Sequence, residues 1–193
     1  MFSKELNAKL DEFHLLKHPF YQAWNEGKLS REIIKDYAEQ YYHHVKAFPR
    51  YISATHSICE NIADRKILLE NLNDEEDKNN DHPKLWKQFA VALGADENEI
   101  EKVKLEKFTS EMIDNFFKQG RSTYAEGLSG LAFFETHKKA DVYHRQECEV
   151  LLDNLSKDDQ AKAEKAALST AKYLWNFLSG VAQKHNLNVQ AAA

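Results

Sequence analysis

Three ionisable side chains interrupt an apolar line late in the chain. Steps of three and four residues lead from Phe134 through His137, Asp141 and His144 to apolar residues beyond them. On a helix these steps keep side chains on one face, so the three groups are predicted to point the same way. Imidazole and carboxylate groups are costly to bury without a partner. A first-row transition metal suits this donor set, and a salt-bridged seam or a solvent-filled groove is the alternative interpretation.

A second seam carries two further candidate ligands. Glu75 and His82 interrupt a line of apolar residues that recurs every three or four positions between Leu68 and Leu93. His82 precedes Pro83, and a residue before proline avoids the α region. We therefore expect Glu75 to close one helix and His82 to open the next. A capping or turn role is the alternative for both residues.

A third seam is aromatic. Tyr37, Tyr41 and His44 fall on one helical face. They form either an ordinary core stripe with polar tips at its edge or a pocket of oxidisable rings beside a metal. Tyr21 has no distinguishing spacing of its own.

The composition limits the class of protein. The chain has 193 residues, 42% of them hydrophobic, and only 6 Gly and 3 Pro, which favours one domain of long helices. We assign residues 1–185 to that domain and 186–193 to a flexible tail. The formal net charge is −5 without a basic block, so we expect no nucleic-acid partner. No apolar run reaches the roughly 20 residues of a membrane span, and the N-terminus lacks a signal-peptide core, so a cytoplasmic location is expected.

Helical periodicity predicts an all-α chain, with no convincing strand pattern. The expected helices cover residues 3–17, a restart at Pro19, and then 30–48, 50–59, 62–76, 83–94, 110–120, 133–155 and 156–184.

Five segments carry a resemblance to known proteins. They resemble a bacterial group named after a chlamydial protein associating with death domains, within the haem-oxygenase-like diiron oxidases related to TenA and PqqC. The segments are FYQAW at 20–24, YYHHVKAFP at 41–49, LNDEE at 72–76, LWKQF at 85–89 and ADVYH at 140–144.

The resemblance implies a fold, a site and an activity. It implies a compact bundle of about seven helices that binds two Fe ions, or one Fe and one Mn. The matching ligand positions are Glu75, His82, His137, Asp141 and His144. Members of the group are implicated in making 4-aminobenzoate for folate, with O2 as co-substrate and one of their own tyrosines as precursor.

The tyrosine in the family's matching position corresponds to Tyr21, and Tyr41 falls among the pocket aromatics, with Tyr37 and His44 as further candidates for its lining. An external reductant is expected, and base rates favour a homodimer. A death-domain partner follows only by weak analogy.

One departure from the family pattern stands out. The family has a further core helix between the segment matching 127–131 and the one matching 134–144, carrying another Glu ligand and a lysine linked to activity. About two dozen residues, or one helix with its loop, are absent here. Either the protein lacks this helix, or a segment is omitted between consecutively numbered residues. The second interpretation predicts that two neighbours between Gly130 and Phe133 lie far beyond the ~3.8 Å of bonded Cα atoms.

Three other functions compete with a dimetal oxidase. A cofactorless TenA-like hydrolase on the same fold would need a nucleophilic cysteine, and Cys148 lies one turn beyond His144. A haem oxygenase would need only one axial histidine. A protein-interaction module would need an exposed apolar patch and no buried His and Asp.

Overall fold

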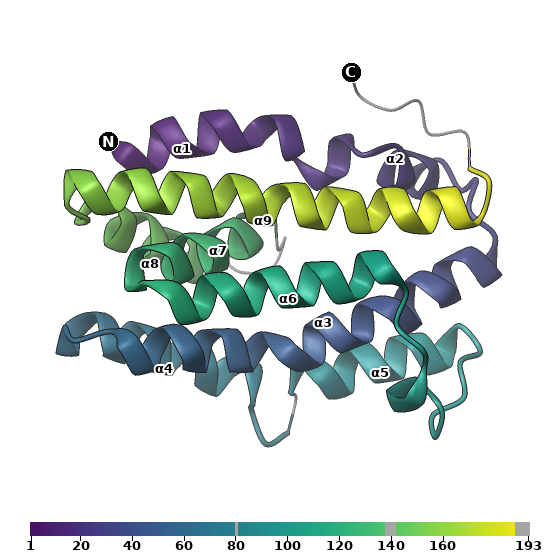
Figure 1. Cartoon of the computed structure of the whole chain (residues 1–193). Coiled ribbons are helices and arrows are strands. Elements are labelled where there is room, and N and C mark those ends of the chain that lie inside the picture. The colour runs from purple at the N-terminus through teal and green to yellow at the C-terminus, as the bar shows by residue number, and fades with distance from the viewer. Residues whose placement is uncertain (80, 138–141, 188–193) are drawn as a thin grey trace.

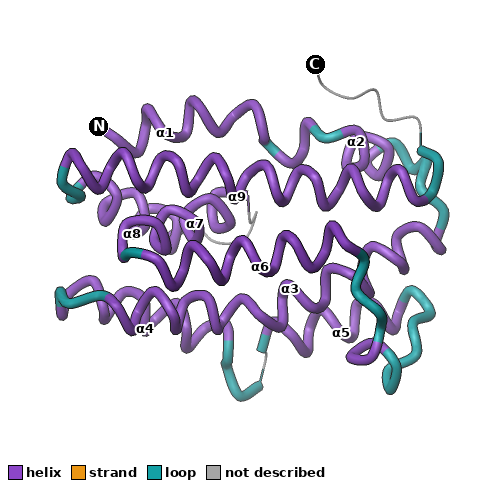
Figure 2. Tube along the Cα trace, in the orientation of Figure 1, coloured by secondary structure: helices purple, strands orange, loops and turns teal. Residues whose placement is uncertain are grey.

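The computed structural model describes residues 1–79, 81–137 and 142–187, without the side chains of 133–137, 142–145 and 147. Every regular element in these ranges is a helix (Figures 1 and 2), which confirms the all-α prediction. The α-helices are α1 Phe2–Leu10, α2 Pro19–Asn25, α3 Arg31–Ile58, α4 Ile62–Glu75, α5 His82–Ala92, α6 Lys107–Ser122, α7 Tyr124–His137, α8 Val142–Asp153 and α9 Lys157–Lys184. Short 3-10 helices lie at Asp11–Phe13, Leu15–Lys17 and Ile100–Lys102. None of the described helices is long and apolar enough to cross a membrane.

Two long helices frame the bundle. α3 and α9 have 28 residues each, which makes them about 42 Å long. In Figure 1, α9 runs beside α1 along one side and α3 runs with α4 and α5 along the other, with α6, α7 and α8 between them. α9 contacts α6 and α7, and α3 contacts α4, α5, α6 and α7. The buried core between these helices includes Phe48, Tyr51, Leu128, Leu174 and Phe177.

Side-chain caps start several of the helices where the sequence predicts. The Ser30 hydroxyl accepts the Ile33 amide at the start of α3, and Ser156 exchanges hydrogen bonds with Asp159 at the start of α9. Each cap satisfies an amide that has no partner inside its helix. These two boundaries were readable because the capping residue stands directly before the periodic pattern.

The first helix is shorter than its pattern suggests. α1 ends at Leu10, not near Lys17, and two 3-10 turns follow. His14 leaves the helical region with φ −59° and ψ 115°, and its Nδ1 accepts the Leu16 amide. This local cap replaces the continued helix.

The two helices predicted on either side of Pro49 are one helix. Pro49 is buried inside α3. Proline inside a helix costs about 3 kcal/mol. Phe48, Tyr51 and Ile52 are each 1% exposed, and their burial outweighs that cost.

The predicted helix over 133–155 is divided. α7 ends at His137, and α8 begins at Val142 and packs back against α7 and α1. α7 begins at Tyr124, so one helix from there to Leu155 would run about 48 Å and would carry the buried Leu151 and Leu152 out of the bundle. α7 also passes without interruption through 130–133, so the predicted gap between consecutive residues is wrong. Of the predicted tail, 188–193 lies outside the described residues.

Candidate active site

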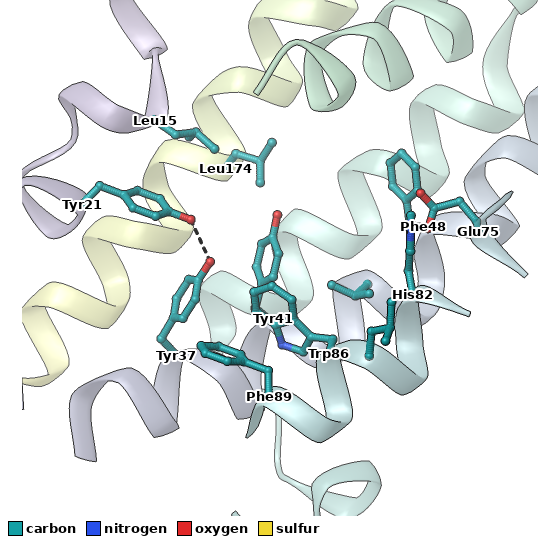
Figure 3. A pocket seen from close by; sticks show the side chains of 12 residues that line it. Leu15, Tyr21, Tyr37, Tyr41, Phe48, Glu75, His82, Trp86, Phe89 and Leu174 are labelled. Carbon is teal, nitrogen blue, oxygen red and sulfur yellow. Dashed lines mark hydrogen bonds and ion pairs between the residues drawn. The ribbon is translucent and has the colours of Figure 1, made fainter. Parts of the chain in front are cut away.

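A cavity of about 380 Å³ lies between α2, α3, α5 and α9, with the end of α4 at one side. Figure 3 shows tyrosines gathered at one end and an acid–imidazole pair at the other, with Tyr41 between them. Apolar and aromatic side chains form most of the wall. The lining residues are Leu15, Tyr21, Tyr37, Tyr41, Val45, Phe48, Glu75, His82, Leu85, Trp86, Phe89 and Leu174.

Two tyrosine hydroxyls meet at the aromatic end. The Tyr21 and Tyr37 hydroxyl oxygens are 2.9 Å apart (Figure 3). Tyr37 is 2% exposed, with ring centroids of Phe20 at 5.1 Å and Tyr41 at 5.5 Å from its own. Such closely packed rings leave little rotational freedom. The aromatic end is therefore shaped before any ligand arrives.

The two hydroxyls of this pair differ in acidity. Burial raises the pKa of Tyr21 and raises that of Tyr37 well above its ordinary value. Their mutual hydrogen bond lowers the pKa of Tyr21 and raises that of Tyr37. A hydrogen bond to the charged form favours that form. Tyr21 is therefore the easier of the two to deprotonate, and Tyr37 would donate the hydrogen bond to the deprotonated oxygen.

A buried histidine holds the helix that carries Tyr21. His18 is 0% exposed, and its Nδ1 accepts the Phe20 amide at the start of α2. Its Nε2 is 3.0 Å from the Ser179 hydroxyl, which donates its own hydrogen to the Trp175 carbonyl. Ser179 must therefore accept from Nε2–H, which fixes the neutral tautomer. Burial lowers the pKa of His18 to about 4, so the imidazole is uncharged near neutral pH. In this form its two hydrogen bonds connect α2 to α9.

Glu75 and His82 form the acidic end. Glu75 is the last residue of α4 and His82 the first of α5, as the sequence predicts. Glu75 Oε2 lies 2.6 Å from His82 Nδ1, and Glu75 is 3% exposed. Asp81 caps α5 by accepting the Lys84 amide, which fixes the start of the helix on which His82 stands.

The negative charge of Glu75 reaches the middle of the cavity. Burial raises the pKa of Tyr41 well above its ordinary value, and the charges of Tyr21, Tyr51 and Glu75 add to the increase. Tyr41 therefore stays a neutral phenol, with the acidic end on one side and the tyrosine pair on the other.

The acidic end suits a transition metal in its donor chemistry. It brings a buried carboxylate and an imidazole together from two helices, and these are donors that iron and manganese accept. His137 is the last residue of α7 and His144 lies in the first turn of α8, while Asp141 lies outside the described residues. No group of three or more His, Cys, Asp or Glu converges among the side chains that the structure describes.

Polar contacts fix the far end of the helix that carries His144. The Ser3 amide and hydroxyl donate to the Asp153 carboxylate at 2.8 and 2.9 Å, and Asn7 donates to Glu149. These bonds hold α8 against α1.

Sequence periodicity missed part of the lining and included one residue that lies behind it. Leu15, Trp86 and Leu174 line the cavity, and only helix packing brings them there. His44 is fully buried with its ring 5.1 Å from that of Tyr41, and it is not part of the lining. Burial lowers the pKa of His44 to about 3.

The fold has relatives among known proteins. The chain has the haem-oxygenase-like fold, matching a domain with that fold from Shewanella denitrificans OS217 with a TM-score of 0.77 at 14% identity over 98% of this chain and 94% of that one. A TenA homologue from P. horikoshii OT3 matches with a TM-score of 0.76 at 16% identity, covering 95% and 99% of the two chains. The profile of the TENA/THI-4/PQQC family matches residues 4–129, and the chain belongs to this family.

Curated relatives carry the name 4-aminobenzoate synthase. The protein from Chlamydia muridarum is 35% identical over 208 residues, covering 92% of this chain and 88% of the relative. The protein from Nitrosomonas europaea is 32% identical over 230 residues, covering 97% and 94%.

Both aligned lengths exceed the 193 residues of this chain, so the relatives hold residues without a counterpart here. The family match ends at residue 129, next to the place where the resemblance implies a helix that is absent here.

Proposed function

We propose that this chain is an O2-dependent dimetal oxidase that forms 4-aminobenzoate from one of its own tyrosines, Tyr21. One observation carries the proposal: a single cavity joins Tyr21 to the Glu75–His82 pair. The curated relatives named 4-aminobenzoate synthase supply the product class. The cytoplasmic location and the homodimer remain predictions.

The ring of tyrosine already has the substitution pattern of the product. Its oxygen stands opposite Cβ, as the nitrogen of 4-aminobenzoate stands opposite the carboxyl carbon. Conversion requires oxidation of Cβ to a carboxylate, cleavage of the Cα–Cβ bond, and exchange of the ring oxygen, which leaves as water, for the nitrogen of an amine donor. The first two changes are oxidations, which is why the proposal requires O2 and an external reductant.

Glu75 and His82 are the donors around which a metal site would form. His137, Asp141 and His144 are proposed as the remaining ligands, for two Fe ions or one Fe and one Mn. When bound, the metal pair would supply the electrons that reduce O2. The carboxylate that the family places on its additional helix has no counterpart here, so the proposal requires the other donors to suffice.

The described side chains have separate parts in this proposal. Tyr37 orients Tyr21 through the 2.9 Å hydrogen bond and stabilises its deprotonated oxygen. Tyr41 fills the space between the pair and Glu75. Trp86, Phe89 and Leu174 make the wall apolar, which keeps bulk water from a reactive ring.

The direct test follows the ring from the protein to the product. Protein labelled with ring-13C tyrosine would be loaded with Fe and Mn and given O2 and a chemical reductant, and 4-aminobenzoate would be measured by mass spectrometry. We expect 13C-labelled product, a matching loss of protein mass, and neither in Tyr21→Phe.

Tyr173→Phe is the matched control, because Tyr173 does not line the cavity, and it should react like wild type. Unlabelled product would overturn the use of an internal tyrosine. A wild-type chain that takes up no metal would overturn the oxidase.

The competing hydrolase gains no support from the cavity. A TenA-like hydrolase needs a cysteine that reaches the substrate. Cys59 and Cys148 are each 4% exposed, and neither belongs to the lining.

A further inference from the structure

A second hollow lies on the surface between α3 and α6, and it shares no lining residue with the cavity. It is a groove of about 360 Å³. One wall is the face of α3 that repeats at three- and four-residue steps, and the other is one turn of α6. The lining residues are Arg50, Ser53, Ala54, Ser57, Phe117 and Arg121.

One aromatic ring holds both arginines in the groove. The guanidinium carbon of Arg50 lies 4.8 Å from the centroid of the Phe117 ring, and that of Arg121 lies 4.5 Å from the same centroid. Tyr51 packs edge-on against Phe117 with centroids 4.7 Å apart, so the ring itself is fixed from the core. Cation–π attraction to a fixed ring restrains each guanidinium. Both guanidinium groups are thus held beside the same ring.

These arginines differ from the other two whose side chains are described. Arg31 donates to the Ala92 and Leu93 carbonyls at the end of α5, and Arg65 donates to the His56 and Cys59 carbonyls at the end of α3. Those two guanidinium groups are used to close helices. Neither Arg50 nor Arg121 has a hydrogen bond or an ion pair within the described part of the chain.

No nearby acid neutralises the two charges. Asp114, one turn before Phe117 on α6, is close enough to raise the pKa of Tyr51, but it is not within ion-pair distance of either guanidinium. The chain as a whole has 31 acidic and 26 basic residues, and several of its described lysines have carboxylate partners. Arg50 and Arg121 therefore differ from these lysines, because they are restrained but have no carboxylate partner within the described part of the chain.

We propose that this groove binds a phosphate monoester, with its doubly charged phosphoryl group between Arg50 and Arg121. Two guanidinium forks on two helices match an oxyanion with three terminal oxygens, whereas a carboxylate is satisfied by one fork. The Ser53 hydroxyl can donate to a third oxygen. The groove lies at the lower end of small-molecule site volumes, so it has room for an organic group attached to the phosphate. This site is independent of the proposed oxidase.

The test is calorimetric titration with phosphoserine and inorganic phosphate at low salt. We expect saturable binding that weakens by roughly tenfold in Arg50→Gln and in Arg121→Gln. Arg50→Lys keeps the charge but loses the fork, so it should also weaken binding. Lys66→Gln makes the same charge change on the exposed face of α4 and should bind like wild type.

The source of the phosphate is distinguished by vesicles of phosphatidylcholine with phosphatidic acid. Binding to these vesicles that Arg121→Gln removes would support the site and identify a lipid headgroup as its ligand. Equal binding by wild type and both glutamine variants would overturn the proposal, as would phosphate binding that malonate matches at equal concentration. Because both arginines are exposed, the variants should keep the wild-type circular dichroism spectrum and melting temperature, which checks that they fold.

Discussion

The two ends of the cavity are built in different ways. At the aromatic end, Tyr37 is enclosed by rings from α2, α3, α5 and α9. At the acidic end, Glu75 ends α4 and His82 begins α5, and His82 keeps 31% of its side chain exposed. One end is set by packing, and the other by the ends of two helices. We therefore expect substitutions to destabilise the aromatic end more than the acidic end, and the acidic end to adjust when a ligand binds.

Removing the Tyr37 ring, at the aromatic end, should lower the free energy of unfolding more than any change at the acidic end. Tyr37→Ala would remove a buried ring that packs against four others and would enlarge the cavity, and we expect a loss of about 3–5 kcal/mol in the free energy of unfolding. Tyr37→Phe keeps the ring and removes only the hydroxyl bonded to Tyr21, so it should lose about 1 kcal/mol. Urea unfolding of both variants measures the difference. Similar losses in the two would show that the hydroxyl, and not the packed ring, holds this end.

Protonation of His18 should loosen the aromatic end as the pH falls. The pKa of His18 is about 4 in the fold against 6.5 for the unfolded chain, so the unfolded chain binds more protons between these values. The contribution of His18 to the free energy of unfolding is fully present above pH 6.5 and is lost as the pH falls toward 4. The total loss from this group is about 3 kcal/mol.

The measurement is urea unfolding between pH 7 and pH 4.5 on wild type and His18→Asn. Asparagine can cap α2 but does not titrate, so the variant should show a shallower decline with acid. His44, whose pKa is about 3, remains in both proteins and cancels in the comparison. Parallel curves would assign the acid sensitivity to other groups.

A change at the acidic end should have the smallest effect on stability. Glu75→Gln keeps the shape of the side chain and an oxygen that can accept a hydrogen bond from His82 Nδ1, so neither side chain has to lose its partner. We expect a change within about 1 kcal/mol in urea unfolding, together with a clear loss of bound iron and manganese by elemental analysis. A large loss of stability without metal would mean that the acidic end is as structural as the aromatic end.

The sequence was most informative for features that depend on a few neighbouring residues. The tyrosine stripe of α3, the serine caps and the Glu75–His82 junction follow from spacing and from proline chemistry within a few residues. Leu15 and Leu174 could not be found this way, because they are distant from α3 in the sequence and reach the cavity only in the folded bundle. His44 shares the periodicity of Tyr41 but points into the core, which a repeat of three and four residues does not resolve.

The division between α7 and α8 was the main failure of pattern reading. Periodicity over 133–155 is genuine, but it says nothing about the room available in the bundle. The segment before it continues the same helix back to Tyr124, and the buried side chains of α8 require it to fold back. Helix length is a property of the whole fold, so local pattern alone does not determine it.

Pro49 gives the long helix α3 one position at which it can bend. Proline has no amide hydrogen, so the Val45 carbonyl lacks the helical bond it would otherwise accept. Val45 lines the cavity, while Arg50 and Ser53 begin the surface groove just beyond the proline. A small bend at this position has no Pro49–Val45 hydrogen bond to break. The cavity and the surface groove therefore take lining residues from opposite sides of Pro49 on the same helix. A change in the bend of α3 at Pro49 would change the shape of both.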